Sequence, residues 1–251
     1  MPLRAKVNTS GADELFRRMG WTLKNSLPGF MRQEARLVAV SLATQTQPFG
    51  NTATSKRIGE VAVSRDIYRV YATPGKAFED IQDRHAQSGF WKAVKALAWD
   101  RAKKILNKSA SAFKLTPIDN FDGGAAHRQL RNKQGRIPPS QKPVMIVRNP
   151  STLKTYIETE KGKVGFGKGG WASCARALGG TRGIPGWVSR QNAPARVIED
   201  YGTDISKVTM TNMVPYASEI ISQAGKQDAI FIARDRLRKS VRIALRNSRT
   251  R

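Results

Sequence analysis

The chain has 251 residues and carries 44 Lys and Arg against 19 Asp and Glu, which gives a formal net charge of +25. Its single cysteine, Cys174, excludes an intramolecular disulfide scaffold, and no apolar run approaches the roughly 18 residues of a bilayer-spanning helix. Apolar residues make up 39% of the chain and recur with helical spacing, which excludes a wholly disordered protein.

The periodicity of apolar residues predicts a mostly helical chain with few strands. Residues 1–27 are expected to form an N-terminal arm, with one or two helical turns between Leu15 and Trp21. The predicted helices are 29–44, 74–82, 90–106, 150–157, 163–178, 215–222 and 229–247. The last of these is expected to present one apolar side, formed by Ile232, Leu237, Val241 and Ala244 or Leu245. The predicted extended segments are 58–63, 144–147 and 207–212, whereas 66–71 fits either a helix or a strand. The fold class is therefore α+β, with a small antiparallel sheet and long irregular loops.

Three segments have loop composition. Residues 45–57 are polar and contain Pro48 and Gly50, and residues 179–187 are rich in glycine after a left-handed helix stop at Gly179. Residues 107–143 have little periodicity. Irregular stretches of that length are typically functional or ordered by a partner.

The glycine-rich segment 165–170 fits the pattern G-x-G-x-x-G and most of a phosphate-loop pattern. A nucleotide site also needs a preceding buried strand, and a phosphate loop needs a Ser or Thr after its lysine. Neither condition is met, because residues 156–163 have the pattern of a helix and a charged turn, and Lys168 is followed by Gly169. Close helix packing around small residues is the preferred interpretation.

The residues that usually carry catalysis are scarce. The two histidines, His85 and His127, lie outside any zinc-binding spacing, and Cys174 is flanked by small residues without a histidine nearby. No paired-carboxylate pattern indicates a two-metal nuclease. We therefore expect a protein that is not an enzyme, with no cofactor and no metal, and a DNA-processing enzyme is the disfavoured alternative.

Positive charge is concentrated at the C-terminus, where nine basic and two acidic residues lie between Lys226 and Arg251. A solvated helix face with a basic tail is one interpretation, and a contact with phosphates or with an acidic partner is the other. On the second interpretation, one strip of the last helix faces DNA or an acidic partner. Its residues are Arg234, Arg238, Arg242 and Arg246.

Three stretches share an order with a known group of proteins. They are residues 47–51 with 55–59 after the first helix, residues 163–188, and residues 211–217 before the terminal helix. Together they resemble small basic structural proteins of tailed bacteriophages, namely minor tail, tail-completion or head–tail connector (neck) proteins. Short members have a Pro-x-x-[ST]-Gly loop and later an Asn-x-x-x-Tyr-Ala segment. Residues 212–217 fit the second pattern, whereas residues 48–52 lack the glycine of the first.

The resemblance implies a single α+β domain over 28–251, with an insertion at about 64–143 relative to the short members and a basic C-terminal helix. It further implies a structural virion protein of the neck or tail top that forms a ring, most simply a hexamer, around the DNA channel. Its partners would be other phage neck and tail proteins and genomic DNA in the channel, but no membrane. It would reside in the virion, and in the host cytoplasm during assembly.

Aromatic and arginine side chains dominate the energetics of many protein interfaces, so we expect such residues at the contacts between subunits. The candidate subunit-interface residues are Trp187, Arg182, Arg190 and His127. The alternative function is sequence-nonspecific nucleic-acid binding, for which charge is the motivation. No recognisable nucleic-acid-binding motif accompanies that charge.

Overall fold

The computed structural model describes residues 3–8, 27–133, 135–201 and 206–249. The chain divides into two compact units, which we call unit 1 (Met1–Gly59 with Val164–Arg251) and unit 2 (Glu60–Lys163). Helix α3 (Ala53–Tyr68) begins in unit 1 and ends in unit 2. The fold is mostly helical α+β, which confirms the class predicted from the sequence.

Unit 1 contains a three-stranded antiparallel sheet in the order β1-β6-β5. Its strands are β1 (Leu3–Asn8), β5 (Ala195–Tyr201) and β6 (Ser206–Asn212). The predicted strand at 207–212 is confirmed as part of β6, and Val208 and Met210 are fully buried on its inner face. Residues 3–8 of the expected arm lie in this sheet, whereas the helical turns expected between Leu15 and Trp21 fall outside the described residues.

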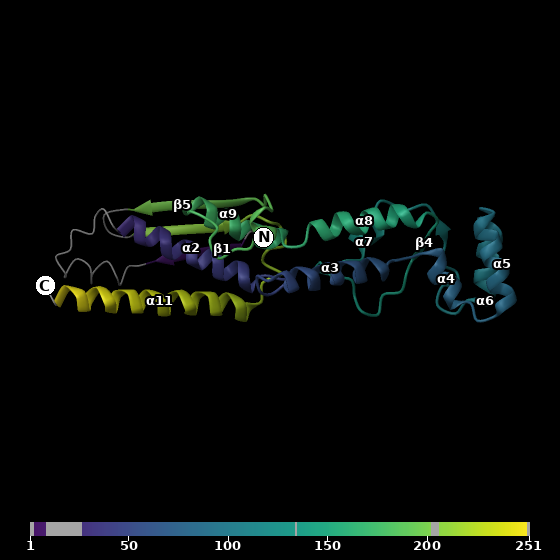
Figure 1. The fold of residues 1–251 in the computed structure, drawn as a ribbon, viewed down its shortest axis with the longest axis horizontal. Helices are drawn as coiled ribbons and strands as arrows, with labels where there is room; N and C mark the ends of the chain where they lie inside the picture. Colours follow the sequence, from purple (N-terminus) through teal and green to yellow (C-terminus); the bar gives the residue numbers. More distant parts are fainter. Residues whose placement is uncertain (1–2, 9–26, 134, 202–205, 250–251) are drawn as a thin grey trace. The chain divides into compact units, whose positions relative to one another are not determined.

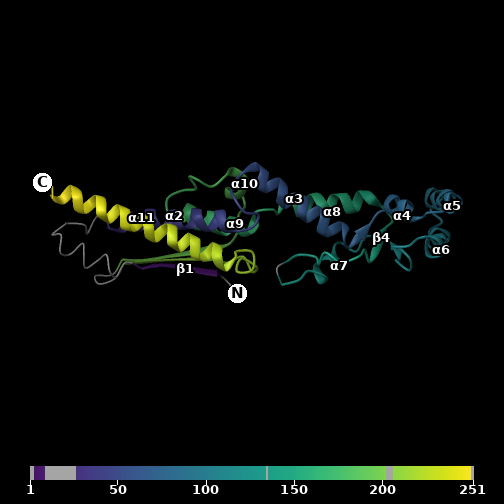
Figure 2. The same ribbon diagram turned by 90° about the horizontal axis from the view of Figure 1, so that it is seen from below.

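Helices cover one face of this sheet (Figures 1 and 2). Helices α2 and α9 contact the strands, and α11 packs along α2. The predicted helix at 29–44 is confirmed as part of α2, because its apolar stripe from Met31 to Leu42 is buried in the core of unit 1. The helices of unit 1 besides α3 are α2 (Leu27–Gln45), α9 (Phe166–Ala177), α10 (Gly186–Ser189) and α11 (Gln223–Arg249).

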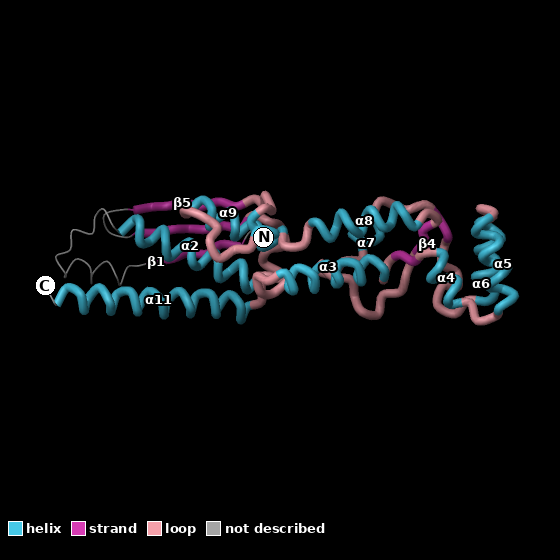
Figure 3. Tube along the Cα trace, viewed as in Figure 1, coloured by secondary structure: helices cyan, strands magenta, loops and turns pink. Residues whose placement is uncertain are grey.

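Unit 2 is built on a short parallel sheet in the order β2-β4-β3. Its strands are β2 (Tyr71–Ala72), β3 (Ile118–Asp119) and β4 (Met145–Val147). Its helices besides α3 are α4 (Pro74–Asp80), α5 (Arg84–Lys95), α6 (Trp99–Ser109), α7 (Ala125–Gln129) and α8 (Pro150–Gly162). Figure 3 shows that much of the chain between α6 and β4 is loop, as the sequence indicates for 107–143.

Side chains at the starts of α4, α5 and α8 explain why these helices begin where they do. Thr73, Asp83 and Asn149 each accept a hydrogen bond from a backbone N–H in the first turn. Such a cap satisfies a donor that has no partner inside the helix. Proline follows the cap in α4 and α8, where its missing N–H is not needed.

Four sequence-based expectations are wrong. Residues 58–63 are helical within α3, because the side chain of Thr52 accepts a hydrogen bond from the Ser55 N–H and caps that helix. The predicted helix at 90–106 is a hairpin of α5 and α6, since the chain turns at Leu97 with a φ of 55°. The segment 215–222 forms turns, because the backbone at residues 220 and 221 pairs with residues 46 and 47 instead.

The fourth error concerns the phase of the terminal helix. Ile232 was expected on its apolar inner side, but this residue is 43% exposed. Ala229 and Ala233 face the core in its place, and these small side chains permit the close approach of α11 to α2.

Among the described residues, no helix is both long and apolar enough to cross a membrane.

Candidate functional site

The glycine-rich start of α9 is a packing site. A β-carbon at Gly167 would lie 2.1 Å from Cδ1 of Ile220, and one at Gly170 would lie 2.0 Å from Oδ1 of Asn212. The Asn212 amide also donates to the Gly167 carbonyl at 2.8 Å. These contacts confirm the packing interpretation of the glycines over a phosphate loop.

Lys168, the lysine of that pattern, is fully buried in unit 1. Its Nζ donates to the carbonyl oxygens of Ala43 at 2.8 Å and Gly50 at 2.5 Å, and to Oδ1 of Asn51 at 3.2 Å. Burial lowers the pKa of this amine to about 7. All three ammonium donors are thus used to fasten α9 to the end of α2 and the loop after it, which leaves none for a phosphate.

The residues predicted around Trp187 divide between the interior and the surface. Trp187 is half-buried against the core of unit 1, and its ring leaves no room for a β-carbon at Gly165. Its indole nitrogen is buried without a hydrogen-bond partner in the part of the chain that the structure describes. Arg182 and Arg190 are exposed, and the Arg182 carbonyl accepts from the Arg36 side chain at 3.2 Å.

The outer side of α11 combines positive charge with apolar surface. Arg234 and Arg238 are exposed, and neither forms an ion pair with any residue that the structure describes. Beside them, Ile230 and Phe231 are 63% and 70% exposed. The remaining members of the predicted strip, Arg242 and Arg246, lie on the same helix, but their side chains are outside the described residues.

The inner side of α11 faces an acidic group of α2. Glu34 is buried, and its Oε2 has no hydrogen-bond partner among the described residues. Burial raises the pKa of this carboxyl, an effect that the nearby Arg236 guanidinium opposes. Arg236 and Glu34 therefore attract each other at the contact between α2 and α11. This attraction does not involve the outward-facing Arg234 and Arg238.

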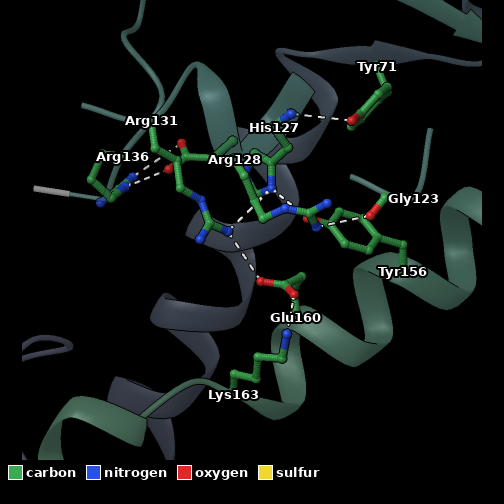
Figure 4. Close-up of polar contacts among 10 residues, drawn as sticks. Tyr71, Gly123, His127, Arg128, Arg131, Arg136, Tyr156, Glu160 and Lys163 are labelled. Atoms are coloured by element: carbon green, nitrogen blue, oxygen red, sulfur yellow. Dashed lines mark hydrogen bonds and ion pairs between the residues drawn. The ribbon is translucent and has the colours of Figure 1, made fainter. Parts of the chain in front are cut away.

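His127 lies in a polar network inside unit 2, where its side chain is only 2% exposed (Figure 4). Its Nδ1 lies 2.9 Å from the Tyr156 hydroxyl and 3.2 Å from Nη2 of Arg131. The same Nη2 donates to Glu160 at 3.2 Å, and Lys163 donates to the other oxygen of that carboxylate at 2.5 Å.

The network fixes the protonation state of His127. Because a guanidinium can only donate, Nδ1 must accept, and the proton of a neutral ring then lies on Nε2. Burial and the charge of Arg131 lower the pKa of His127 to about 4. Burial alone would raise the pKa of Glu160, but the hydrogen bonds from Lys163 and Arg131 outweigh it and lower that pKa.

A second arm of the network joins β2 to α7. The Tyr71 hydroxyl donates to Asp122 at 2.6 Å and accepts from the backbone N–H of His127 at 3.2 Å. Burial and the neighbouring Asp122 carboxylate raise the pKa of Tyr71 well above its ordinary value. His127 is thus enclosed by its own unit, and its predicted place at a subunit interface stays a prediction.

Neither cysteine nor metal chemistry finds support in the described residues. Cys174 is fully buried, and burial raises the pKa of its thiol to about 12, so the reactive thiolate is strongly disfavoured. Within residues 3–8, 27–133, 135–201 and 206–249, no group of three or more His, Cys, Asp or Glu side chains could hold a metal ion.

Comparisons with known proteins do not identify a family for this chain, so its function is inferred from its own sequence and structure. No protein-family profile matches the chain, and neither the curated proteins nor the solved structures contain a match. Arg234 and Arg238 of the predicted strip are exposed, and the strip as a contact surface stays a prediction. The exposed apolar pair Ile230 and Phe231 was not predicted. The apolar run 230–232 was the available signal, and helical periodicity assigns such a run to the core.

Proposed function

We propose that this chain is a structural protein of a bacteriophage virion, located at the neck or tail top, which forms a ring around the DNA channel and docks to neighbouring virion proteins. The observation that carries the proposal is the outer side of α11. Phe231, Arg234 and Arg238 are spaced three and four residues apart, so they share one face of the helix.

Such a face is suited to burial against another subunit. Covering a Phe or Ile side chain that is otherwise exposed contributes about 1.5–3 kcal/mol. Arginine beside an aromatic residue is typical of the energetically dominant part of an interface. The net charge of +25 over the whole chain supports a role next to polyanionic or acidic partners.

The sequence resemblance to neck and tail-completion proteins supplies the biological setting. Its best-fitting segment, residues 212–217, includes Asn212 and Ala217, both fully buried in unit 1. The resemblance in that segment therefore concerns the core of unit 1 and supports a similar fold. The exposed surface of α11 supports the assembly of subunits into a ring.

The test is the mass of the purified full-length protein, measured by light scattering at about 50 mM and about 1 M NaCl. We expect a discrete oligomer, six-fold or twelve-fold, that survives high salt. Phe231→Glu combined with Arg234→Glu should yield a folded monomer. The matched control is Met213→Glu, which alters a side chain that is 48% exposed elsewhere in unit 1 and should leave the oligomer intact.

A monomer at every salt concentration, both alone and with purified connector or tail-tube proteins, would contradict the proposal. Sequence-nonspecific nucleic-acid binding is the second candidate, favoured by exposed basic side chains that have no acidic partner. A monomer that binds DNA only at low salt would support that candidate instead.

A further inference from the structure

The hairpin of α5 and α6 in unit 2 gathers positive charge on its surface. The two helices pack through Phe90 and Ala93 on α5 and Ala102 and Leu106 on α6, all of them buried. Between residues 92 and 108 the outer side chains include six basic residues and one acidic residue, Asp100. The six, all exposed, are Lys92, Lys95, Arg101, Lys103, Lys104 and Lys108. We call them the hairpin cations.

Among the described residues, the hairpin cations have no acidic partner and gather within residues 92–108, whereas other unpaired basic residues of unit 2, such as Arg65 and Lys154, lie apart in the sequence. Arg136 pairs with Asp66, and Lys161 pairs with Glu158. None of the six hairpin cations forms an ion pair with a residue that the structure describes. Their mutual repulsion is therefore uncompensated within the described chain, and an external anion would relieve it.

Helix stability explains only part of this arrangement. Lys92 and Lys95 lie in the last turn of α5 and Lys108 lies in the last turn of α6, where positive charge is favourable to the helix dipole. Arg101, in contrast, is the third residue of α6, where the dipole disfavours a cation. Together with Lys104 and Lys108 it forms a line along α6 at spacings of three and four residues.

The line on α6 matches a phosphate backbone in scale. Residues 101–108 rise roughly 10 Å along the helix axis, at about 1.5 Å per residue. Phosphates of one DNA strand rise about 3.4 Å per nucleotide, so the line spans roughly three phosphates. Five of the six hairpin cations are lysines, whose compact charge suits contacts to phosphates without sequence preference.

An anionic membrane is a poorer fit. A helix that binds at a membrane surface needs an apolar face to insert, and the apolar faces of α5 and α6 are already buried against each other and the rest of their core. At this end of the unit, Trp91 and Leu97 are the large apolar side chains of α5 and of the turn after it that are exposed, at 38% and 70%. The attraction of the hairpin to an anionic membrane would therefore be mainly electrostatic.

We propose that the α5–α6 hairpin is a sequence-independent binding surface for duplex DNA, which it holds by the phosphate backbone. This surface consists of residues of unit 2 and includes none of α11, so it goes beyond the proposed ring function and does not rest on it.

The test uses the full-length protein and a fluorescein-labelled 30-base-pair duplex of mixed sequence, with fluorescence anisotropy recorded between 50 and 300 mM NaCl. The hairpin variant carries R101Q, K103Q, K104Q and K108Q. The matched control carries R65Q, K133Q, K142Q and K154Q, which remove the same charge from exposed sites elsewhere in unit 2. Circular dichroism verifies that each variant is folded, and K104Q with K108Q serves if the fourfold hairpin variant is not.

We expect the hairpin variant to lose at least tenfold in affinity at about 100 mM NaCl. Each lost phosphate contact reduces the slope of log K against log salt by about 0.9, so the slope should fall by two to four. The control should lose less than threefold. A second, unrelated duplex sequence should give the same affinities.

Three outcomes would overturn the proposal. They are failure of the unmodified protein to bind the duplex, equal binding by the hairpin variant and the unmodified protein, and an equal loss of affinity in the control and the hairpin variant. Binding to phosphatidylserine vesicles that depends on the hairpin, without binding to the duplex, would assign the surface to membranes. Because all these variants leave α11 unchanged, failure here is distinguishable from failure of ring assembly.

Discussion

The side chain of Asn212 occupies the space that a β-carbon would need at Gly170. Its Oδ1 would lie 2.0 Å from that β-carbon, and the same oxygen accepts a hydrogen bond from the Val214 N–H at 3.1 Å. Its amide nitrogen donates to the Gly167 carbonyl at 2.8 Å. One buried asparagine at the end of β6 thus joins the glycine-rich turn of α9 to the segment that leads towards α11.

Gly170→Ala should therefore destabilise unit 1 strongly. The added methyl group would displace Asn212 and break its two buried hydrogen bonds, which we expect to lower the free energy of unfolding by about 3 kcal/mol or more. Urea unfolding followed by circular dichroism measures this change. Gly29→Ala is the control, because a β-carbon there meets nothing within 4 Å in α2 and should stabilise the helix by up to about 1 kcal/mol. Equal stability of both variants would contradict the packing role of Gly170.

Local pattern was enough to predict the elements whose apolar residues repeat over several turns. The stripe from Met31 to Leu42 located α2, and the alternation of Val208 and Met210 located β6. Strand β5 gave no such signal, because its core side includes Glu199, which Arg32 holds at 2.9 Å from 167 residues away. A contact between residues that are 167 positions apart cannot be predicted from a short window of the sequence.

The candidate sites were predictable to different degrees. Charge alone pointed to Arg234 and Arg238, and the structure shows both of them exposed. The burial of His127 could not be predicted, because its partner Tyr156 lies 29 residues away in a different helix, α8. The hairpin cations were not predicted as one surface, because a continuous helix over 90–106 would distribute its basic residues around a single axis.

Lys168→Met should destabilise unit 1, because the carbonyls of Ala43 and Gly50 would lose a buried donor. We expect a loss of about 2–4 kcal/mol in the free energy of unfolding. Lys154→Met, at an exposed site, should change it by less than about 0.5 kcal/mol. Guanidinium unfolding at pH 6 provides the comparison, and matching values for the two variants would contradict this account of Lys168.

The effect of Lys168 should also depend on pH. Burial lowers the pKa of this amine from 10.5 to about 7 in the folded state, so between those values the unfolded chain binds more protons. Stability relative to Lys168→Met should therefore rise as the pH increases from 7 towards 10. Unfolding measured at pH 6, 8 and 9.5 tests the sign, and a difference that shrinks with pH would contradict it.

Leu97 is held in a left-handed conformation at the turn between α5 and α6, with a φ of 55° and 70% of its surface exposed. That conformation costs a side chain about 1–2 kcal/mol, which glycine avoids at some expense in conformational entropy. Leu97→Gly should thus stabilise unit 2 by about 0.5–1 kcal/mol. Leu97→Ala keeps the β-carbon and should give no gain, and thermal unfolding of both variants distinguishes relief of strain from loss of a surface side chain.

His127 should make unit 2 sensitive to acid. Its folded-state pKa is about 4 against 6.5 for the free side chain, so the unfolded chain binds more protons between these values. The stability that comes with neutral His127 is fully present above pH 6.5 and is lost as the pH falls to 4. A difference of that size corresponds to at most about 3 kcal/mol. Protonation would also place a cation beside Arg131, at the nitrogen that now accepts from its guanidinium.

His127→Asn removes the titrating ring but keeps an acceptor for Tyr156 and Arg131, so the slope of stability against pH between 6.5 and 4 should become shallower. His85→Asn, at an exposed position in α5, should leave that slope unchanged. Chemical unfolding at half-unit pH intervals measures both slopes, and the nuclear magnetic resonance titration of the His127 ring measures its pKa directly. Parallel slopes in the two variants, or a His127 ring that titrates near 6.5, would show that the network does not hold this histidine neutral.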